Sequence, residues 1–389
     1  MVSGLTAIVV VAAKPGLLFA SLIALTYVAV AIGRMWRFGG REPLAGTAGA
    51  PATILKPLCG DEPFLYENLR SFCDQEYPQF EVIFGVRDPA DPAIPVVERV
   101  REEFPDLEIR LIVDDCVHGE NHKASNLANM SGAAKYDLLV VADSDMRVDR
   151  GYLATVTTPL SDPRVGVVTC LYVGRPALNV WSALGAMFIN EWFLPSVLVA
   201  QATTAMPLCF GSTMALRREV LDSIGGFLML ADELADDYVL GQRVAARGLR
   251  IVLSPHVVET VVAESSFRSL WWRELRWART IRSIQPLGYA LSFVTYAVPL
   301  ALLHLLVSPF RPDGWVILAA AVGLRVSAHH AARGAFGVSA GRAWAAPVRD
   351  LLSFVVWASS FCGRTVRWRG YEMVVERGGR LRTERPEAR

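Results

Sequence analysis

The sequence predicts an α/β domain built on a mostly parallel sheet, with membrane helices before and after it. From residue 53 onward, short apolar runs rich in Val, Ile and Leu alternate with helical patterns, which is typical of a parallel sheet covered by helices on both faces. Uncharged apolar runs long enough to cross a bilayer flank this region. The mean hydropathy of +0.33 is high for a soluble enzyme and agrees with membrane segments.

The first membrane run covers residues 16–33. Arg34, Arg37 and Arg41 follow it at once, and the positive-inside rule places this end of the run in the cytoplasm. A cleaved signal peptide is the alternative. It would need positive charge ahead of the apolar stretch, where only Lys14 is available, so an uncleaved anchor is favoured.

A second uncharged run covers residues 286–308 and is preceded by five arginines: Arg268, Arg273, Arg276, Arg279 and Arg282. Its leading end is therefore also expected in the cytoplasm, together with everything between the two runs. Two later apolar stretches, 315–332 and 345–362, are interrupted by Arg325 and by Arg349 and Asp350. Charges are costly in lipid, so these stretches are expected to be re-entrant or interfacial.

These features divide the 389 residues into four predicted parts. They are an N-terminal membrane anchor (1–42), a cytoplasmic α/β domain (43–285), C-terminal membrane or re-entrant helices (286–363) and a cytoplasmic tail (364–389). The net charge of +1 gives no sign of a nucleic-acid partner, whose phosphates favour a basic surface. The six cysteines are scattered without close pairs, so neither a disulfide framework nor a zinc site is indicated.

Within the α/β domain, strands are expected at 53–58, 81–86, 109–113, 138–142 and 165–170, and helices at 64–73, 94–104, 122–133 and 152–159. Such sheets bind ligands at the carboxyl ends of their strands. The sequence has no GxGxxG after the first strand and no GxxxxGK[ST], which disfavours dinucleotide-binding and P-loop enzymes. The apolar segment 177–200 carries Asn190, Glu191 and Pro195; an interfacial helix and a buried core helix both remain open for it.

The strongest local motif is Asp143-Ser144-Asp145, directly after the apolar strand 138–142. Two carboxylates at i and i+2 on this edge of a sheet can hold a divalent cation, which neutralises a diphosphate. The alternative is an ordinary turn, where Asp and Ser are common. The position after a buried strand favours the site.

Asp236 and Asp237 open a helix that runs to about Ala246, and two more acidic residues, Asp232 and Glu233, precede them. Acidic residues in a first helical turn interact favourably with the helix dipole, and capping alone would explain them. The functional alternative is that Asp237 acts as a general base on an acceptor hydroxyl, tuned by its like-charged neighbours.

Arg273, Arg276 and Trp277 lie in an RELRW sequence just before the second membrane run. A positive-inside anchor with an interfacial tryptophan accounts for them. Arginine also pairs bidentately with phosphate oxygens, so Arg273 and Arg276 are candidates for binding a diphosphate at the membrane surface.

Two further candidates are Asp88 and Lys123. Asp88 follows the second strand and is either a turn residue or an acceptor for a base or ribose, and Lys123, near a helix start, is either a surface lysine or a phosphate contact. His256, His329 and His330 have no carboxylate or cysteine at ligand spacing and are interpreted as structural.

Taken in order along the chain, these motifs resemble the GT-A glycosyltransferases of the ceramide-glucosyltransferase type, which show a series of aspartates followed by (Q/R)xxRW near a membrane segment. Asp88, Asp143 and Asp237 match the aspartates, and Arg273–Trp277 matches RxxRW, over about residues 53–308. The resemblance implies a GT-A fold, a Rossmann-like mixed sheet with flanking helices, and an inverting hexosyltransferase with a UDP-sugar donor, a lipid acceptor and a divalent cation, Mg²⁺ or Mn²⁺.

The resemblance also implies roles for individual residues. Asp88 would contact the uridine, Lys123 the donor phosphates, Asp143 and Asp145 the metal and diphosphate, and Asp237 would be the catalytic base. The remaining motif residues, Arg273, Arg276 and Trp277, would hold the diphosphate and the acceptor end. A carboxylate at Asp145 is not required in the ceramide enzymes.

Stretches at 56–63, 188–193 and 283–289 look like the bacterial hopanoid-biosynthesis branch of this group. Its members are thought to transfer N-acetylglucosamine from UDP-N-acetylglucosamine to bacteriohopanetetrol, which implies a multi-pass protein of the bacterial inner membrane. The alternatives are a ceramide glucosyltransferase using UDP-glucose, a processive polysaccharide synthase, which the few clear spans disfavour, and a non-catalytic membrane scaffold, which the intact carboxylates disfavour.

Overall fold

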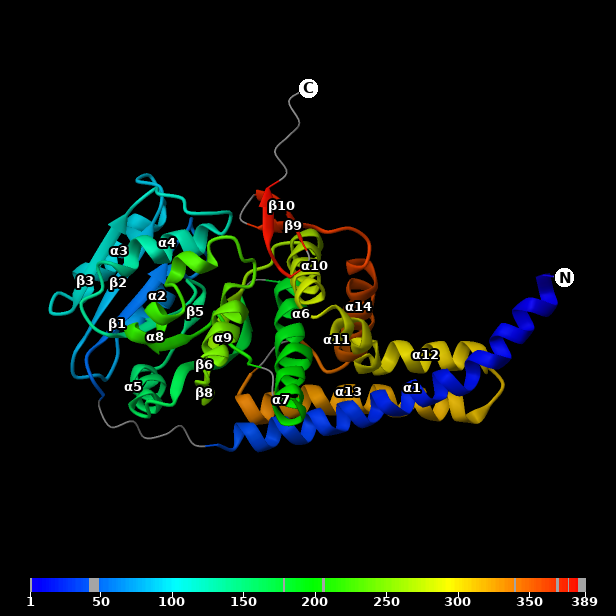
Figure 1. Ribbon diagram of the computed structural model, residues 1–389. Coiled ribbons are helices and arrows are strands. Elements are labelled where there is room, and N and C mark those ends of the chain that lie inside the picture. Colours follow the sequence, from blue (N-terminus) through cyan, green and yellow to red (C-terminus); the bar gives the residue numbers. More distant parts are fainter. Residues whose placement is uncertain are drawn as a thin grey trace, which may run out of the picture. The chain divides into compact units, whose positions relative to one another are not determined.

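The computed structural model describes residues 2–41, 49–177, 179–204, 207–338, 341–368, 371–376 and 378–383. The chain forms two compact units, and each is assembled from segments far apart in the sequence (Figure 1). We call them the helical unit, which comprises Met1–Gly40, Leu178–Thr203 and Glu264–Glu372, and the sheet unit, which comprises Arg41–Ala177, Thr204–Ala263 and Met373–Arg389.

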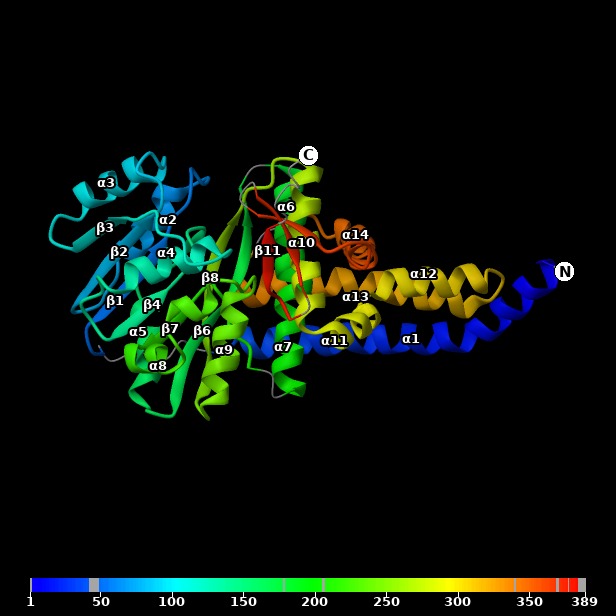
Figure 2. The same ribbon diagram turned by 45° about the horizontal axis from the view of Figure 1, so that its top comes forward.

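The sheet unit contains one twisted eight-stranded sheet in the order β3-β2-β1-β4-β7-β6-β8-β5 (Figure 1, Figure 2). The strands are β1 (Ala52–Pro57), β2 (Phe80–Val86), β3 (Glu108–Val113), β4 (Leu138–Val141), β5 (Met146–Arg147), β6 (Val165–Pro176), β7 (Met214–Arg217) and β8 (Arg250–Val262). Strands β1 to β4 are parallel, as are β6 and β8, whereas β7 is antiparallel to both β4 and β6. The sheet is therefore mixed, and the five predicted strands are confirmed as β1, β2, β3, β4 and β6.

Helices cover both faces of this sheet, as predicted. Neighbouring residues on a strand point to opposite faces, and Phe84 and Ile83 accordingly belong to two different hydrophobic cores. Residues of α2 (Leu65–Cys73), α3 (Ala93–Glu103) and α5 (Tyr152–Thr157) join the first core. Residues of α4 (His122–Ser131), α8 (Arg218–Ser223) and α9 (Asp236–Ala246) join the second. Two short 3-10 turns, η1 (Thr158–Ser161) and η3 (Phe227–Leu230), complete the unit.

The helical unit contains the long apolar segments of the chain. Its elements are α1 (Val2–Gly39), α6 (Val180–Phe188), the π-helical turn η2 (Ile189–Phe193), α7 (Leu194–Thr203), α10 (Phe267–Ile284), α11 (Pro286–Leu291), η4 (Ser292–Thr295), α12 (Ala297–Val307), α13 (Pro312–Phe336), α14 (Ala345–Ser360) and β9 (Thr365–Trp368). Two more short strands follow, β10 (Tyr371–Val375) and β11 (Leu381–Thr383), which pair antiparallel.

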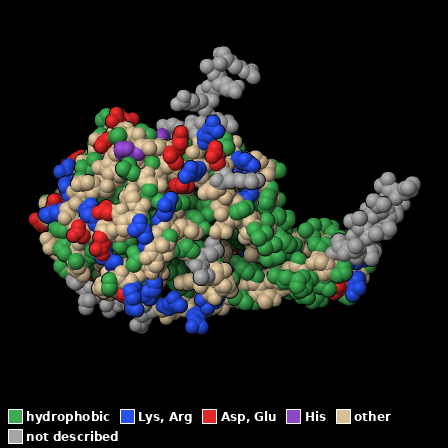
Figure 3. Space-filling model, viewed as in Figure 1, with side chains coloured by type: hydrophobic (Ala, Val, Ile, Leu, Met, Phe, Trp, Pro, Cys, Tyr) green, Lys and Arg blue, Asp and Glu red, His purple; other side chains and the backbone are tan. Residues whose placement is uncertain are grey.

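Three helices of the described chain are long and apolar enough to cross a membrane: Lys14–Gly39, Val180–Thr203 and Pro312–Phe336. The second predicted run is not one straight span, because Pro286–Thr295 and Ala297–Val307 meet at an angle of 67°. Exposed apolar side chains such as Leu306, Trp315 and Val316 cover the outside of α12 and α13, and Figure 3 shows hydrophobic side chains gathered there. This surface suits contact with lipid.

The charged residues that interrupt the later apolar stretches are buried in ion pairs. Arg325 Nη2 lies 2.5 Å from Asp350 Oδ1, and Arg349 Nη2 lies 2.6 Å from Glu274 Oε1. Pairing lowers the cost of these charges away from water. Helix α13 is accordingly one continuous helix that is long and apolar enough to cross a membrane, whereas the sequence predicted a re-entrant or interfacial segment.

The helix from Val180 to Thr203 cannot be a single crossing, despite its length. Strand β6 precedes it and β7 follows it, and the two strands pair within one sheet, with Val167 opposite Leu216. Both ends of the helix therefore lie on the same side of any bilayer. More than half of its most apolar stretch is also buried in the protein.

Candidate active site at the carboxyl end of strand β4

Four charged side chains of the sheet unit meet around the backbone of Gly211. Lys123 Nζ lies 2.7 Å from Asp143 Oδ1 and 3.1 Å from Asp236 Oδ2. The Gly211 N–H donates to Asp237 Oδ2 at 2.8 Å, and the Asp143 N–H donates to the Gly211 carbonyl oxygen at 3.3 Å. We call Lys123, Asp143, Asp236 and Asp237 the carboxylate cluster; it lies where β4 ends, at the edge where sheets of this kind bind ligands.

The start of helix α4 is tied to the segment before α9, and this brings the cluster together. Asn121 caps α4 by accepting from the Ala124 N–H at 3.0 Å. The same side chain donates to the Glu233 carbonyl oxygen at 2.7 Å, and the Asn121 N–H donates to Ala231 O at 2.6 Å. These bonds hold Lys123, in the first turn of α4, beside Asp236 and Asp237, in the first turn of α9.

Gly211 is required at this point because of a close approach. A Cβ atom at this position would lie 3.0 Å from Asp143 Oδ2, 3.1 Å from Lys123 Nζ and 3.6 Å from Asp237 Oδ2. Contacts near 3.0 Å are tighter than most real Cβ contacts, so any side chain here would displace the charged groups. The glycine lets three charged side chains converge on one stretch of backbone.

The carboxylate cluster shifts the pKa values of its members. Burial and the neighbouring Asp236 raise the pKa of Asp237 to about 6, against the opposing effect of Lys123 and two backbone hydrogen bonds. Burial lowers the pKa of Lys123, but Asp143 and Asp236 outweigh it and hold that pKa above its usual range. Near neutral pH, Asp237 is then mostly ionised but readily protonated, which suits a general base, while Lys123 keeps its charge.

Lys56 is hydrogen-bonded to the backbone of the carboxylate cluster at Asp143. It is fully buried on β1, and its Nζ donates to the Asp143 carbonyl oxygen at 2.5 Å and lies 3.7 Å from the centre of the Phe72 ring. Burial lowers the pKa of Lys56 to about 7, opposed by Asp145 and Asp143. The sequence signal for this residue is a lysine inside the apolar run 53–58, where a charge is unusual.

Asp145 is hydrogen-bonded to strand β8. Its Oδ2 accepts from Thr260 Oγ1 at 2.9 Å, and its carbonyl oxygen accepts from the Val261 N–H, both on β8. The described residues contain no group of three or more His, Cys, Asp or Glu side chains that could hold a metal ion. Mg²⁺, however, is often bound through one or two carboxylates together with substrate phosphates and water. The Asp143 side chain is 34% exposed, so this one carboxylate could contact a cation that arrives with a diphosphate.

Asp88 lies two residues beyond the end of β2, on the same carboxyl edge of the sheet as β4, because β1 is parallel to both strands. Its Oδ1 accepts from the Ala90 N–H at 2.8 Å and the residue is exposed. The local turn foreseen as one alternative is thus present, and among the described residues no hydrogen bond joins Asp88 to the carboxylate cluster.

Arg273, Arg276 and Trp277 lie on α10 in the helical unit, which starts with a capping box at Ser266. Arg273 Nη1 lies 3.1 Å from Glu264 Oε1, and its guanidinium lies 4.9 Å from the centre of the Trp277 ring. The structure thus brings Lys123, Asp143 and Asp237 together in the sheet unit and places the RxxRW residues together on one helix of the other unit.

The fold and the cluster define a membrane-associated α/β protein with an acidic site at the edge of its sheet. The chain belongs to Glycosyl transferase family 21, whose model matches residues 16–381. This confirms the predicted resemblance at the level of ceramide-glucosyltransferase-like glycosyltransferases, and with it the predicted class of enzyme and the fold class.

Curated relatives include ceramide glucosyltransferase 1 of Caenorhabditis elegans, 26% identical over 277 residues, which are 70% of this chain and 59% of that protein. The ceramide glucosyltransferase of Komagataella phaffii is 37% identical over 106 residues, 26% of this chain and 21% of that protein. The chain thus spans only about half to three fifths of the length of ceramide glucosyltransferases 1 and 3 of Caenorhabditis elegans.

Among solved structures, a mannosyltransferase from Pyrobaculum calidifontis in complex with GDP-Man and Mn²⁺ is similar, with 22% identity, 88% of this chain and 99% of that chain covered, and a TM-score of 0.47. A GalNAc-T7 structure with UDP, GalNAc and Mn²⁺ covers 66% of this chain and 55% of that chain with a TM-score of 0.42.

Proposed function

We propose that the protein transfers a sugar from a UDP-sugar to a hydroxyl group of a membrane lipid, with inversion at the anomeric carbon. The observation that carries this proposal is the convergence of Lys123, Asp143 and Asp237 on Gly211 in a member of family 21. A base, a fixed positive charge and a carboxylate suited to a cation within one cluster are what a single displacement requires.

In this mechanism Asp237 takes the proton of the acceptor hydroxyl. The hydroxyl oxygen then forms a bond to the anomeric carbon from the face opposite the nucleotide, and the bond from that carbon to the diphosphate oxygen breaks. The UDP leaves with increased negative charge, and Lys123, whose charge the cluster maintains, is placed to compensate it. A divalent cation held by Asp143 and Asp145 would supply further neutralisation of the diphosphate when bound.

The remaining assignments also belong to this proposal. Asp88 would accept a hydrogen bond from the uridine, and Arg273, Arg276 and Trp277 would hold the diphosphate and the acceptor end. Their residue types support these roles, since arginine pairs bidentately with phosphate oxygens. The arginines after the first membrane run support a cytoplasmic location for the sheet unit. The likeness to the hopanoid branch supports the bacterial inner membrane as the membrane concerned. The division at residues 42, 285 and 363 into anchor, domain, membrane helices and tail is part of the same proposal.

For the substrates we propose UDP-N-acetylglucosamine and bacteriohopanetetrol, on the likeness of segments 56–63, 188–193 and 283–289 to the hopanoid branch. The second candidate is UDP-glucose with ceramide, which the names of the curated relatives favour. The two candidates share the site and the mechanism and differ only in the sugar and the lipid.

The test is to supply the purified protein with each donor and each lipid and to follow glycolipid by mass spectrometry and UDP release by a coupled assay. Asp237→Asn should lower turnover by about 10²–10⁴-fold, the usual contribution of a general base, while donor affinity measured by calorimetry persists. The exposed Asp222→Asn is the matched control and should behave like the wild type. Wild-type turnover by Asp237→Asn would rule out the assigned base, and no glycolipid from any pair would contradict the proposal.

A further inference from the structure

Three arginines of the helical unit meet where the chain enters and leaves the apolar helices α11 to α14 (Figure 1). Arg279 and Arg282 lie near the end of α10, just before α11, and Arg364 follows α14. Arg279 Nη2 donates to the Cys362 carbonyl oxygen at 2.5 Å, and Arg282 Nη2 donates to the Gly363 carbonyl oxygen at 2.7 Å. These bonds hold the two ends of the apolar segment together. We call Arg279, Arg282 and Arg364 the arginine cluster.

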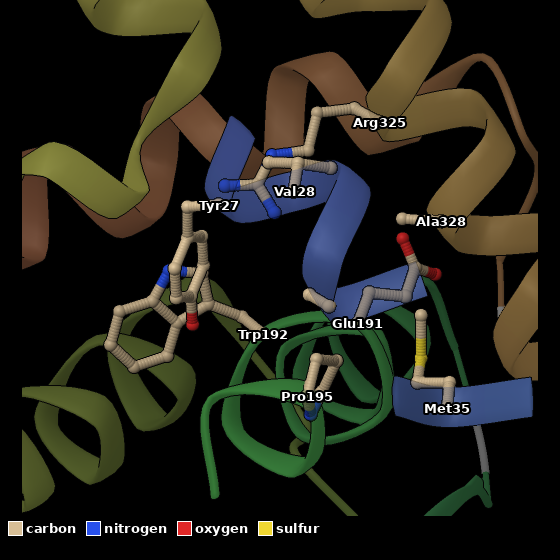
Figure 4. Close-up of a pocket in the computed structure, with 9 residues that line it drawn as sticks. Tyr27, Val28, Met35, Glu191, Trp192, Pro195, Arg325 and Ala328 are labelled. Carbon is tan, nitrogen blue, oxygen red and sulfur yellow. The ribbon is translucent and has the colours of Figure 1, made fainter. Parts of the chain in front are cut away.

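Other charged side chains inside the helical unit have partners of opposite charge. Figure 4 shows Glu191 and Arg325 at a pocket between α1, η2 and α13. Glu191 Oε1 lies 2.7 Å from His329 Nδ1, and Arg325 is paired with Asp350. His329 therefore has a carboxylate partner that sequence spacing did not reveal. Such pairing lowers the cost of holding a charge away from water.

The arginine cluster has no such partner within the part of the chain that the structure describes. No Asp or Glu occurs in residues 275–312 or 351–371, the segments that surround the cluster in the sequence. Arg279 is 8% exposed, and its Nε is buried without a hydrogen-bond partner among the described residues. Burial and Arg282 lower the pKa of Arg279, and burial and Arg364 lower the pKa of Arg282 against an opposing effect of Tyr289. Like charges held together without a counter-charge are costly, and a bound anion would remove that cost.

The surroundings of the cluster indicate what kind of anion would bind. The Arg282 guanidinium lies 5.7 Å from the centre of the Phe361 ring, and Phe361 is exposed. Ile281, Leu287 and Leu291 are exposed as well, and the last two lie on α11, in the bent helix pair that is apolar enough for a membrane. Arginines beside exposed apolar side chains are typical of the headgroup level of a bilayer. An anion that reaches this place from the membrane carries apolar chains.

We propose that the arginine cluster binds the phosphate group of an anionic phospholipid at the membrane surface. Arginine pairs bidentately with phosphate oxygens, and the half-buried Arg282 and the exposed Arg364 would make these contacts. The buried Arg279 adds its charge from behind the loop that follows α14. This phospholipid is not the acceptor: it stays unmodified and holds the two ends of the apolar segment together. The inference therefore does not rest on the proposed function.

The test measures lipid binding and not turnover. The full-length protein in detergent is mixed with equal amounts of phosphatidylglycerol and phosphatidylcholine, and native mass spectrometry should show that phosphatidylglycerol is preferred. Arg364→Gln should weaken phosphatidylglycerol binding about fivefold, and Arg282→Gln together with Arg364→Gln about 25-fold. Arg268→Gln is the control with the same change of charge. Arg268 is exposed in the first turn of α10, about 21 Å along the helix from Arg282, and this variant should bind like the wild type.

A lysine pair separates loss of charge from loss of structure. Arg282→Lys with Arg364→Lys keeps both charges and should regain most of the binding that the glutamine pair loses. A further arm adds excess inorganic phosphate or UDP to the lipid-bound wild type, which should keep its lipid. Displacement by either would assign the cluster to a soluble anion and overturn the proposal, as would equal retention of the two lipids or wild-type binding by the glutamine pair. If phosphatidylglycerol binds as expected but no glycolipid forms with any donor, the proposed function fails and this site stands.

Discussion

The groups around Asp237 shift its pKa in opposite directions, and the resulting pKa predicts how activity depends on pH. Burial and Asp236 raise its pKa to about 6, and a base must be deprotonated to act. We expect kcat/KM for glycolipid formation to rise as the pH increases through about 6 and to level off above it. A pH profile measured with saturating donor checks this, and a flat profile between pH 5 and 7 would contradict the assignment.

The same pKa has a consequence for stability that does not involve substrate. The folded-state pKa lies above the ordinary aspartate value of 3.8, so the folded protein retains a proton that the unfolded chain releases at intermediate pH. The stabilisation from this group is present below pH 3.8 and is lost as the pH rises to about 6. Asp237→Asn lacks this titration. As the pH rises through this interval, the melting temperature of the wild type should therefore fall relative to that of Asp237→Asn.

Gly211→Ala tests the convergence of the charged groups on one point of the backbone. The added Cβ would lie 3.0 Å from Asp143 Oδ2 and 3.1 Å from Lys123 Nζ, so the groups must move apart. Small displacements of reacting groups are costly, and we expect turnover to fall about tenfold or more. Gly132→Ala is the control, because a Cβ there meets nothing within 4 Å. Equal activity of both variants would show that the cluster is not where the chemistry occurs.

At this scale the sequence predicted Lys123, Asp143 and Asp237 as site candidates from their places at a helix start, after a strand and in a first helical turn. It did not predict Gly211 or the contact of Lys123 with Asp236. These depend on Asn121, whose bond to Glu233 joins loops 112 positions apart. Single-chain patterns report local structure and do not contain such pairings.

Among the elements, strand β1 has a role beyond the core because Lys56 holds the end of β4. In Lys56→Met the side chain keeps its length but loses the charge-assisted hydrogen bond to Asp143, worth about 1.5–3 kcal/mol. We expect the KM for the donor to rise by about tenfold or more.

The melting temperature of Lys56→Met separates positioning from folding. Replacing a buried charge by an apolar group is often neutral or stabilising, so this temperature should not fall. Lys135→Met, at a half-exposed surface lysine, is the control and should leave the donor KM unchanged. A wild-type donor KM in Lys56→Met would show that the hydrogen bond does not position Asp143.

Elements with an uninterrupted apolar run were predictable, and short or interrupted ones were not. Strands β1 to β4 and β6 follow from their apolar runs, whereas β7 has four residues and β5 only two. Strand β8 is the longest, with 13 residues, but Ser254, Pro255 and His256 interrupt its apolar run, and the sequence did not predict it. The bend in 286–308 arises because a new helix starts near Val298, whose N–H donates to Asp350 Oδ2 at 2.9 Å. Pro299 follows in the first turn of α12, where the missing N–H of proline is tolerated. The partner, Asp350, is 52 residues away and cannot be read from the run itself.

For the whole molecule, chain connectivity limits the number of membrane crossings. The chain leaves the sheet unit at Ala263 and re-enters it at Met373, so the segment between them crosses an even number of times. If α13 is one span, the bent pair α11–α12 is the partner that completes a hairpin, with Phe310 in its connecting loop. The sheet unit then lies on one side and Phe310 on the other.

Phe310→Cys tests this arrangement. Phe310 is 98% exposed, and a membrane-impermeant maleimide should label the new cysteine in intact cells. The test is made in a Cys362→Ser background, because Cys362 is also exposed and lies in the helical unit. That background without the Phe310 change is the matched control: its remaining exposed cysteines, Cys59 and Cys116, lie in the sheet unit and should be labelled only after the membrane is permeabilised. Labelling of the control in intact cells would place the sheet unit outside the cytoplasm and remove its access to nucleotide sugars.

The central claim is that a lipid hydroxyl, deprotonated by Asp237, displaces the diphosphate in one step. The anomeric configuration of the purified glycolipid, measured by proton NMR, tests this most directly. From an α-linked UDP-sugar the mechanism gives a β-linked product, because a single attack from the opposite face inverts the carbon. An α-linked product would require retention of configuration and would contradict the account.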